Sequence, residues 1–292
     1  MRVTQSMLSN NMLRNLSSSY ERLSKYQDQI STGKKVNRPS DDPVVVMKGI
    51  SYRRNLSEVQ QYKRNFSEAY NWIENSDAAL DNAGQALQRI RELVVEASND
   101  TYDASQRQAI SEEIKQLRDH LAEVANTKFG DKYLFNGGDT TTKPVDLQAN
   151  NGNGTFPVTT QPVEIELSKG IYLPVNVPGE KVFGQDLFSD LQALADELDK
   201  GNNPSGYLDK IDQHIDAINN VRADLGARQN RLEMMESRVD TQEVIATKVL
   251  SDNEDVNYEK AIMDLTTQES VHRAALAVGA KVLQPTLMDF LT

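Results

Sequence analysis

The chain has 292 residues, of which 38% are hydrophobic and 26% charged, with a formal net charge of −11. This length allows one or two domains, and the apolar content suits the thin core of an elongated helical bundle. The absence of cysteine excludes disulfides and thiolate metal sites. No apolar run approaches the length of a membrane span, and the first residues lack the apolar stretch of a cleavable secretory signal. We therefore expect no membrane insertion, and any export would need another route.

Charge is distributed unevenly along the chain. Residues 1–64 contain 12 Lys and Arg against 5 Asp and Glu, whereas the remainder contains 20 against 38. Two interpretations stay open: a solvated helical face, which is the usual meaning of a charge run, or attraction between the basic end of one subunit and an acidic neighbour. Nucleic acid is disfavoured as a partner, because a pI near 4.9 would repel phosphate.

The first segment, residues 1–42, is predicted to be an amphipathic N-terminal arm. Gly33 is a plausible helix stop, and Asp42 before Pro43 can cap the next helix. Its apolar side chains follow one helical stripe and are the candidate assembly residues of this arm: Leu13, Leu16, Tyr20, Leu23 and Ile30.

Residues 43–138 are predicted to form the first half of a helical rod. An apolar residue recurs every seventh position, which is the spacing of a coiled-coil seam: Val45, Tyr52, Val59, Phe66, Ile73, Leu80, Leu87 and Val94. The long helix should run from Pro43 to about Ser98. Asp103, with Gln106 three residues later, predicts the capping box of a shorter second helix.

Residues 139–184 are rich in Thr, Asn, Gly and Pro and are predicted to be a small β-rich insertion. Apolar residues alternate with polar ones on both sides of a turn that contains Gly170, which indicates a hairpin. The prolines around these stretches favour edge strands.

Residues 185–255 are predicted to be the second half of the rod. Helical patterning over residues 186–200 stops at Gly201 and then resumes, and a second seam comprises Ile211, Ile218, Leu225, Leu232, Val239 and Ala246. We expect the two seams to pair antiparallel. The polar residues 251–255 are predicted to be a solvated break, because they lack the turn glycine and the terminal bidentate Glu of a calcium loop.

Residues 256–292 are predicted to be an amphipathic C-terminal assembly arm, with Leu276, Leu283, Leu287 and Phe290 as its candidate interface residues. The fold class is therefore mainly α: an antiparallel coiled-coil or bundle rod with a small β insertion and amphipathic terminal helices. A lone arm cannot bury its stripe, so the arms either pack on the body or stay mobile until they assemble. We expect mobility in the isolated subunit up to about Asp41 and from about Val256.

No catalytic or cofactor chemistry is predicted. His120, His214 and His272 are far apart in the sequence and lack the helical spacing of a metal site. Gly33-Lys34-Lys35 lacks the remaining residues of a phosphate-binding loop. We expect no cofactor and no metal.

Three motifs give the chain a family resemblance. They read QISTGKKVNRPSDDP at residues 29–43, KYLFNGG at residues 132–138 and VRADLGARQNRL at residues 221–232. Together they resemble the flagellin family of bacterial flagellar proteins, and Arg-Pro before Ser-Asp-Asp-Pro is typical of its hook-associated members at the hook-filament junction. The resemblance extends over nearly the whole chain. The chain departs from ordinary flagellin at residues 43–46 and at its final residues.

The resemblance implies a secreted, extracellular structural protein of the flagellum. Such a subunit passes through the flagellar type III export apparatus, with an export chaperone, and assembles as a ring of copies. Its neighbours would be hook-associated protein 1 on the hook side and flagellin on the filament side. In this family the terminal segments are disordered in the free subunit and become paired helices on assembly.

Three other functions remain open on the sequence alone. The chain could be a filament-forming flagellin, which would polymerise unaided, or a cytoplasmic coiled-coil adaptor or export chaperone, which would have ordered termini and no export. A hydrolase that uses the β insertion would need a cleft with perturbed titratable groups.

Overall fold

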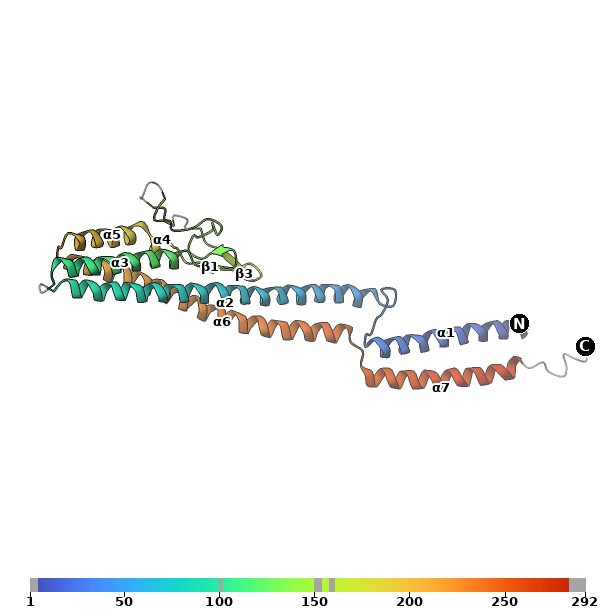
Figure 1. The fold of residues 1–292 in the computed structure, drawn as a ribbon. Coiled ribbons are helices and arrows are strands. Elements are labelled where there is room, and N and C mark those ends of the chain that lie inside the picture. The colour runs from blue at the N-terminus through green and yellow to red at the C-terminus, as the bar shows by residue number, and fades with distance from the viewer. Residues whose placement is uncertain (1–4, 100–101, 150–153, 158–160, 284–292) are drawn as a thin grey trace, which may run out of the picture. The chain divides into compact units, whose positions relative to one another are not determined.

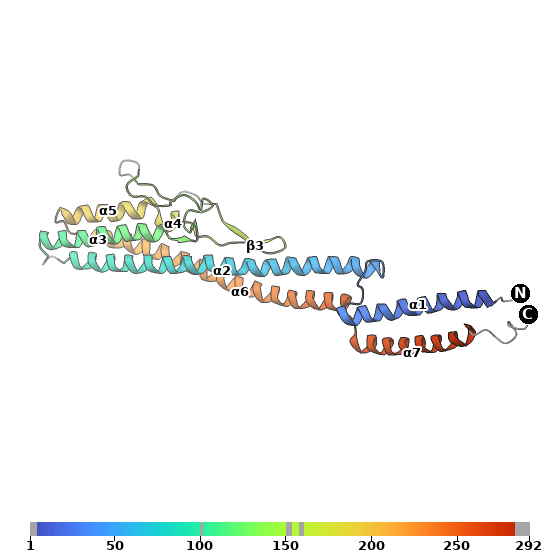
Figure 2. The same ribbon diagram turned by 45° about the vertical axis from the view of Figure 1, so that its right-hand side comes forward.

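The computed structural model describes residues 5–99, 102–149, 154–157 and 161–283. It is mainly α, as predicted, and its residues divide into two compact units (Figures 1 and 2). Unit 1 comprises residues 1–58 and 243–292, and unit 2 comprises residues 59–242. Among the described helices, none combines the length with the apolar composition needed to cross a membrane.

Unit 1 is built from the two ends of the chain. It contains α1 (Gln5–Thr32), α7 (Tyr258–Leu283), the start of α2 (Pro43–Ala97) and the end of α6 (Leu208–Glu254). Helix α1 stops at Gly33, whose φ of 72° is accessible to glycine at little cost. The Asp42 carboxylate accepts hydrogen bonds from the N–H groups of Val44 and Val45 at 3.0 and 3.1 Å, so the predicted cap of α2 is confirmed.

Unit 2 is a packed set of helices. Helices α3 (Ala104–Ala125) and α5 (Gln185–Asp199) lie beside the unit 2 portions of α2 and α6 (Figure 1). The Asp103 capping box of α3 is present as predicted, and so is the stop at Gly201, where φ is 78°. Residues of both predicted seams are buried in one continuous core, including Phe66, Leu80, Leu87, Leu225 and Leu232.

The two seams pair antiparallel within unit 2. Lys63 of α2 contacts Asp240 of α6, and further along the helices Arg91 contacts Asp212. Between them the Arg222 guanidinium bridges Asp77 and Asp81 at 2.9 and 2.7 Å. The order of these pairs runs in opposite directions along the two helices, as an antiparallel coiled coil requires.

Two small antiparallel sheets join the helices of unit 2. Strands β1 (Lys128–Phe129) and β2 (Lys132–Tyr133) form one, and β3 (Glu164–Ser168) and β4 (Ile171–Pro174) form the predicted hairpin. The first helical stretch therefore ends at Ala125, and strands β1 and β2 precede residue 139, where the β insertion was expected to begin. The short helix α4 (Glu180–Phe183) and the 3₁₀ turn η2 (Ser205–Tyr207) complete the connections.

Glu236, at a polar position of the second seam, is half-buried and contacts α2. Its carboxylate accepts a hydrogen bond of 2.9 Å from the Tyr70 hydroxyl, and burial of that hydroxyl, together with this bond, raises the pKa of Tyr70. The Tyr70 hydroxyl on α2 thus supplies the hydrogen-bond partner that a half-buried Glu carboxylate at a seam position needs. Position 236 is consequently a poor surface control for seam mutations.

Replacing Leu80 or Leu225 with Ala should lower the free energy of unfolding by about 2 to 5 kcal/mol, because both side chains are almost fully buried in the core of unit 2. Denaturant unfolding of the purified chain measures this. The matched control is Met234→Ala, whose side chain is exposed beside the buried Met235 and should change stability by less than about 0.5 kcal/mol. Equal losses at the three positions would contradict the assigned seam.

Candidate assembly interface

Unit 1 contains a pair of antiparallel helices, α1 and α7, from opposite ends of the sequence. Helices α1 and α7 lie side by side (Figures 1 and 2). The Gln268 amide donates a 3.0 Å hydrogen bond to the Ser19 hydroxyl, and the rings of Tyr20 and His272 lie 6.2 Å apart. A Cβ on Gly279 would collide with the Met12 methyl group, so the two helices approach closely at this glycine.

The structure divides the candidate residues of α1 into two groups. Leu16, Leu23 and Ile30 are half-buried and share the helix face of Met12 and Ser19, which contacts α7. Leu13 and Tyr20 lie on the flank of that face and are 56% and 64% exposed. The single stripe expected from the sequence is therefore part intramolecular contact and part free surface.

On α7 the contact face is mostly small and polar. It carries Ala261, Gln268, His272 and Gly279, whereas Leu276 is 46% exposed. Leu283 ends α7, but its side chain is outside the described part, and Leu287 and Phe290 lie outside the described residues. The two arms contact each other within one chain, and their mobility in the isolated subunit stays a prediction.

The contact between the two connecting loops was missed in the sequence analysis. Residues 33–35 after α1 pair with residues 254–256 after α6, and we call this pairing the inter-loop contact. The Lys35 N–H donates to the Glu254 carbonyl at 2.7 Å, and the Val256 N–H donates to the Gly33 carbonyl at 2.9 Å. The predicted solvated break at residues 251–255 is thus wrong: these residues join the two ends of the chain.

Charges reinforce the inter-loop contact. The Lys34 ammonium lies 2.7 Å from the Asp255 carboxylate and 3.5 Å from Glu254, and Arg53 of α2 contacts Glu254 at 2.8 Å. Glu254 is buried, and the Lys34 and Arg53 cations compensate its charge. A Cβ on Gly49 would lie 2.6 Å from the Glu254 carboxylate, so the glycine leaves room for it.

Unit 1 leaves most of its large apolar side chains in contact with solvent. Eighteen large hydrophobic residues are exposed in the described part of the chain, and fifteen of them belong to unit 1. In the described part of unit 1, the only fully buried hydrophobic residues are Ala246 and Ala261. Exposed examples on α2 are Val44, Met47 and Ile50, which recur at helical spacing. Exposed apolar surface of this extent is typical of an interaction site.

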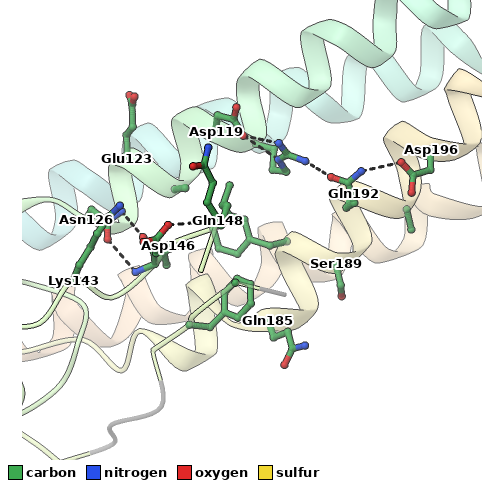
Figure 3. A pocket seen from close by; sticks show the side chains of 18 residues that line it. Asp119, Glu123, Asn126, Lys143, Asp146, Gln148, Gln185, Ser189, Gln192 and Asp196 are labelled. Carbon is green, nitrogen blue, oxygen red and sulfur yellow. Dashed lines mark hydrogen bonds and ion pairs between the residues drawn. The ribbon is translucent and has the colours of Figure 1, made fainter. Parts of the chain in front are cut away.

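A cavity of unit 2 offers little chemistry by comparison. It has a volume of about 960 Å³ and lies between α3, α5, residues 143–148, Gly154 and Phe156 (Figure 3). Arg118 contacts Asp119 and Gln192, and the Gln192 amide donates to Asp196 at 2.8 Å. The lining includes no histidine, and the Ser189 hydroxyl donates to the Asp186 carbonyl. Its described residues therefore form no nucleophile and base pair.

The three histidines do not come together. The His214 ring contacts Asp190 at 3.1 Å, and Lys210 contacts the same carboxylate at 2.6 Å, so His214 belongs to an ion-pair cluster between α5 and α6. His120 lies near Glu123, and His272 contacts α1. Within the described residues, no group of three or more His, Asp or Glu side chains has the arrangement of a metal site.

The two units define a class of helical assembly protein: one unit, from the middle of the sequence, has a packed core, and the other contains paired terminal helices with many exposed apolar side chains. Residues 3–140 match the bacterial flagellin N-terminal helical region, and residues 208–291 match the C-terminal helical region. The chain belongs to the bacterial flagellin family.

Relatives of two kinds resemble the chain along nearly its full length. A flagellin of Halalkalibacterium halodurans is 27% identical, with 94% of this chain and 93% of the relative covered. Flagellar hook-associated protein 3 of Escherichia coli is also 27% identical, with 93% of each covered. The solved flagellar junction protein FlgL of Legionella pneumophila shares the fold, with a TM-score of 0.58, 17% identity and coverage of 71% of this chain and 99% of that one.

The inter-loop contact should weaken in acid. The hydrogen bond from Lys34, then that from the Ser251 hydroxyl, lowers the pKa of Asp255 from its ordinary value of 3.8. A carboxylate whose pKa is lower in the folded chain contributes stability above its unfolded pKa and loses it as the pH falls through its folded pKa. Amide exchange at Lys35 and Val256, whose N–H groups donate across the contact, should therefore lose protection below about pH 4.

Asp255→Asn should remove most of this pH dependence and lower the protection already at neutral pH. Asp252→Asn is the matched control, because the Asp252 contact with Lys35 uses the backbone carbonyl. Identical pH profiles for the wild-type chain and Asp255→Asn would show that this ion pair does not hold the loops together.

Proposed function

We propose that this flagellar structural protein forms the junction between hook and filament and assembles there through unit 1. The observation that carries the proposal is the contrast in burial: unit 2 has a closed core, whereas the described part of unit 1 exposes fifteen large apolar side chains and fully buries none. Burial of such side chains is worth about 25 cal/mol per Å² of apolar surface, so contact with neighbouring subunits would stabilise unit 1 strongly.

The same proposal assigns partners and location. Copies of the chain would form a ring, with hook-associated protein 1 on the hook side and flagellin on the filament side. The subunit would leave the cell through the flagellar type III export apparatus, with an export chaperone, and act outside the cell. The motif at residues 37–43 and the 27% identity to hook-associated protein 3 support the junction role. We propose a structural role without catalysis.

A filament-forming flagellin is the second candidate, because the Halalkalibacterium halodurans flagellin is equally identical over the same share of the chain. Negative-stain microscopy of the purified protein separates the two. A junction subunit should not form long filaments unaided, whereas a flagellin should.

A strain that lacks this chain should build intact hooks without filaments and release unpolymerised flagellin into the medium. Electron microscopy of the cells and immunoblots of the medium measure these outcomes, and the wild-type chain supplied in trans should reverse them. Normal filaments on cells without the chain would refute the junction role.

Leu276→Asp should prevent incorporation at the hook tip and change the stability of the monomer by no more than about 1 kcal/mol. The side chain is half-exposed in one chain, so the carboxylate stays hydrated there, but it would lose water without gaining a partner in an assembled interface. Immunoblots of isolated flagella measure incorporation, and thermal unfolding measures stability.

The control for this variant is Met234→Asp, which places the same charge on an exposed apolar position of unit 2 and should leave both readouts unchanged. If Leu276→Asp unfolds the monomer yet the surviving protein assembles normally, the exposed surface of α7 is not an assembly interface.

A further inference from the structure

All of the sulfur in the chain is in methionine. The sequence contains eight methionines and no cysteine. Six of the methionines belong to unit 1 and two to unit 2, although unit 1 comprises little more than a third of the residues. Thioethers are therefore the groups that a two-electron oxidant attacks in this chain, and they are concentrated in the unit with the exposed apolar surface.

Among the described residues of unit 1, three methionines have exposed side chains. Met7 is 55% exposed on α1, Met47 is 72% exposed on α2 and Met263 is 61% exposed on α7. Met12 differs, because it is half-buried and its methyl group occupies the space beside Gly279. Since the oxidation of a thioether depends on its exposure, Met7, Met47 and Met263 are the reactive sites of this unit in the free chain.

The exposed methionines lie among aliphatic side chains. Met47 is one helical turn from Val44 and one turn from Ile50, and all three are exposed on one side of α2. Met263 shares a side of α7 with the exposed Val271. The aliphatic neighbours have no sulfur, so an oxidant changes the polarity of these surfaces only at the methionines.

Oxidation converts the apolar thioether into a polar sulfoxide. The methionine sulfur attacks one oxygen of hydrogen peroxide with a lone pair, the O–O bond breaks, and the other oxygen leaves as water. Sulfur loses two electrons and the peroxide gains them. The sulfoxide oxygen accepts hydrogen bonds, so burying it without a donor is unfavourable.

We propose that Met7, Met47 and Met263 are oxidation sites through which hydrogen peroxide blocks incorporation of the subunit into the flagellum. In the free chain the sulfoxides stay hydrated, so the fold is retained. In an assembled interface they lose water without gaining a donor, so the oxidised subunit is rejected. The inference rests on the proposed function, since it assumes that unit 1 becomes covered on assembly.

Unit 2 supplies the internal comparison. Met234 is 69% exposed, whereas the adjacent Met235 is 8% exposed. Met234 should therefore be oxidised as readily as the sites of unit 1, but its sulfoxide should not affect incorporation. Met235 reports the rate at a buried thioether in the same chain.

Tandem mass spectrometry after peroxide treatment measures the reactivity of each site. In the purified chain, Met7, Met47, Met263 and Met234 should be oxidised about tenfold or more faster than Met235. In isolated flagella the three sites of unit 1 should be slowed about tenfold or more, because neighbouring subunits cover them, while Met234 keeps its rate. Unchanged rates at the three sites in flagella would overturn the proposal.

Glutamine variants place a polar group at the same sites without an oxidant. Met7→Gln, Met47→Gln and Met263→Gln in one chain should lower incorporation, measured by immunoblots of isolated flagella, about tenfold or more. The melting temperature of the monomer should stay nearly unchanged, because the three side chains are exposed. Met234→Gln is the control and should be incorporated like the wild type. Normal incorporation of the folded triple variant would contradict the proposal.

Leucine variants test whether methionine itself confers the sensitivity. Cells that produce the wild-type chain, Met234→Leu, or the combination of Met7→Leu, Met47→Leu and Met263→Leu are grown with and without hydrogen peroxide. Leucine keeps the apolar volume and cannot form a sulfoxide. Peroxide should lower incorporation of the wild-type chain and of Met234→Leu about tenfold, but that of the triple variant less than about twofold.

The comparison between strains separates this effect from other damage. Any action of peroxide on export or on other flagellar proteins is shared by the three strains. An equal response of all three, whether incorporation is lost or retained, would overturn the proposal. If the wild-type chain without peroxide does not restore filaments to a strain that lacks it, the junction role fails instead, so the two failures are distinguishable.

Discussion

The inter-loop contact is the constraint on which unit 1 depends. Two backbone hydrogen bonds and the pairing of Lys34 with Asp255 join residues more than 200 positions apart in the sequence. Helix α1 ends and helix α7 begins at this contact, so it fixes the point from which the two helices run side by side. Without this contact, the pairing of α1 with α7 would be only weakly stable, because the contact face of α7 is small and polar and few apolar side chains are buried between the helices.

The two units obtain their stability from different sources. Unit 2 buries aromatic and aliphatic side chains from five helices and the β3–β4 hairpin, and this burial suffices for a folded domain. Unit 1 buries almost none and relies on ion pairs that are partly exposed, which contribute little in water. A protein divided in this way can keep one unit folded while the other becomes stable only among its neighbours, which is the requirement of a subunit that must assemble in one place.

The sequence predicted the features of this fold that are local. The heptad seams, the Asp42 and Asp103 caps, the stop at Gly33 and the β3–β4 hairpin all depend on residues a few positions apart, and all are present. It failed where a residue's partner is distant. Residues 251–255 look like a solvated break, because nothing nearby shows that Glu254 meets Lys34 and Arg53. Likewise, the division of the α1 stripe into contact and free surface could not be predicted without knowing which face α7 covers.

The antiparallel coiled coil explains how so distant a contact can form at acceptable entropic cost. Closing a loop of about 220 residues would be unfavourable and slow in an unstructured chain. However, Lys63 with Asp240 and Tyr70 with Glu236 bring α2 and α6 together just before the end of unit 2. Once these helices pair, only short segments separate the loops, so the remaining entropy loss is small. We therefore expect unit 2 to fold before the inter-loop contact forms, and the terminal helices to pair after both.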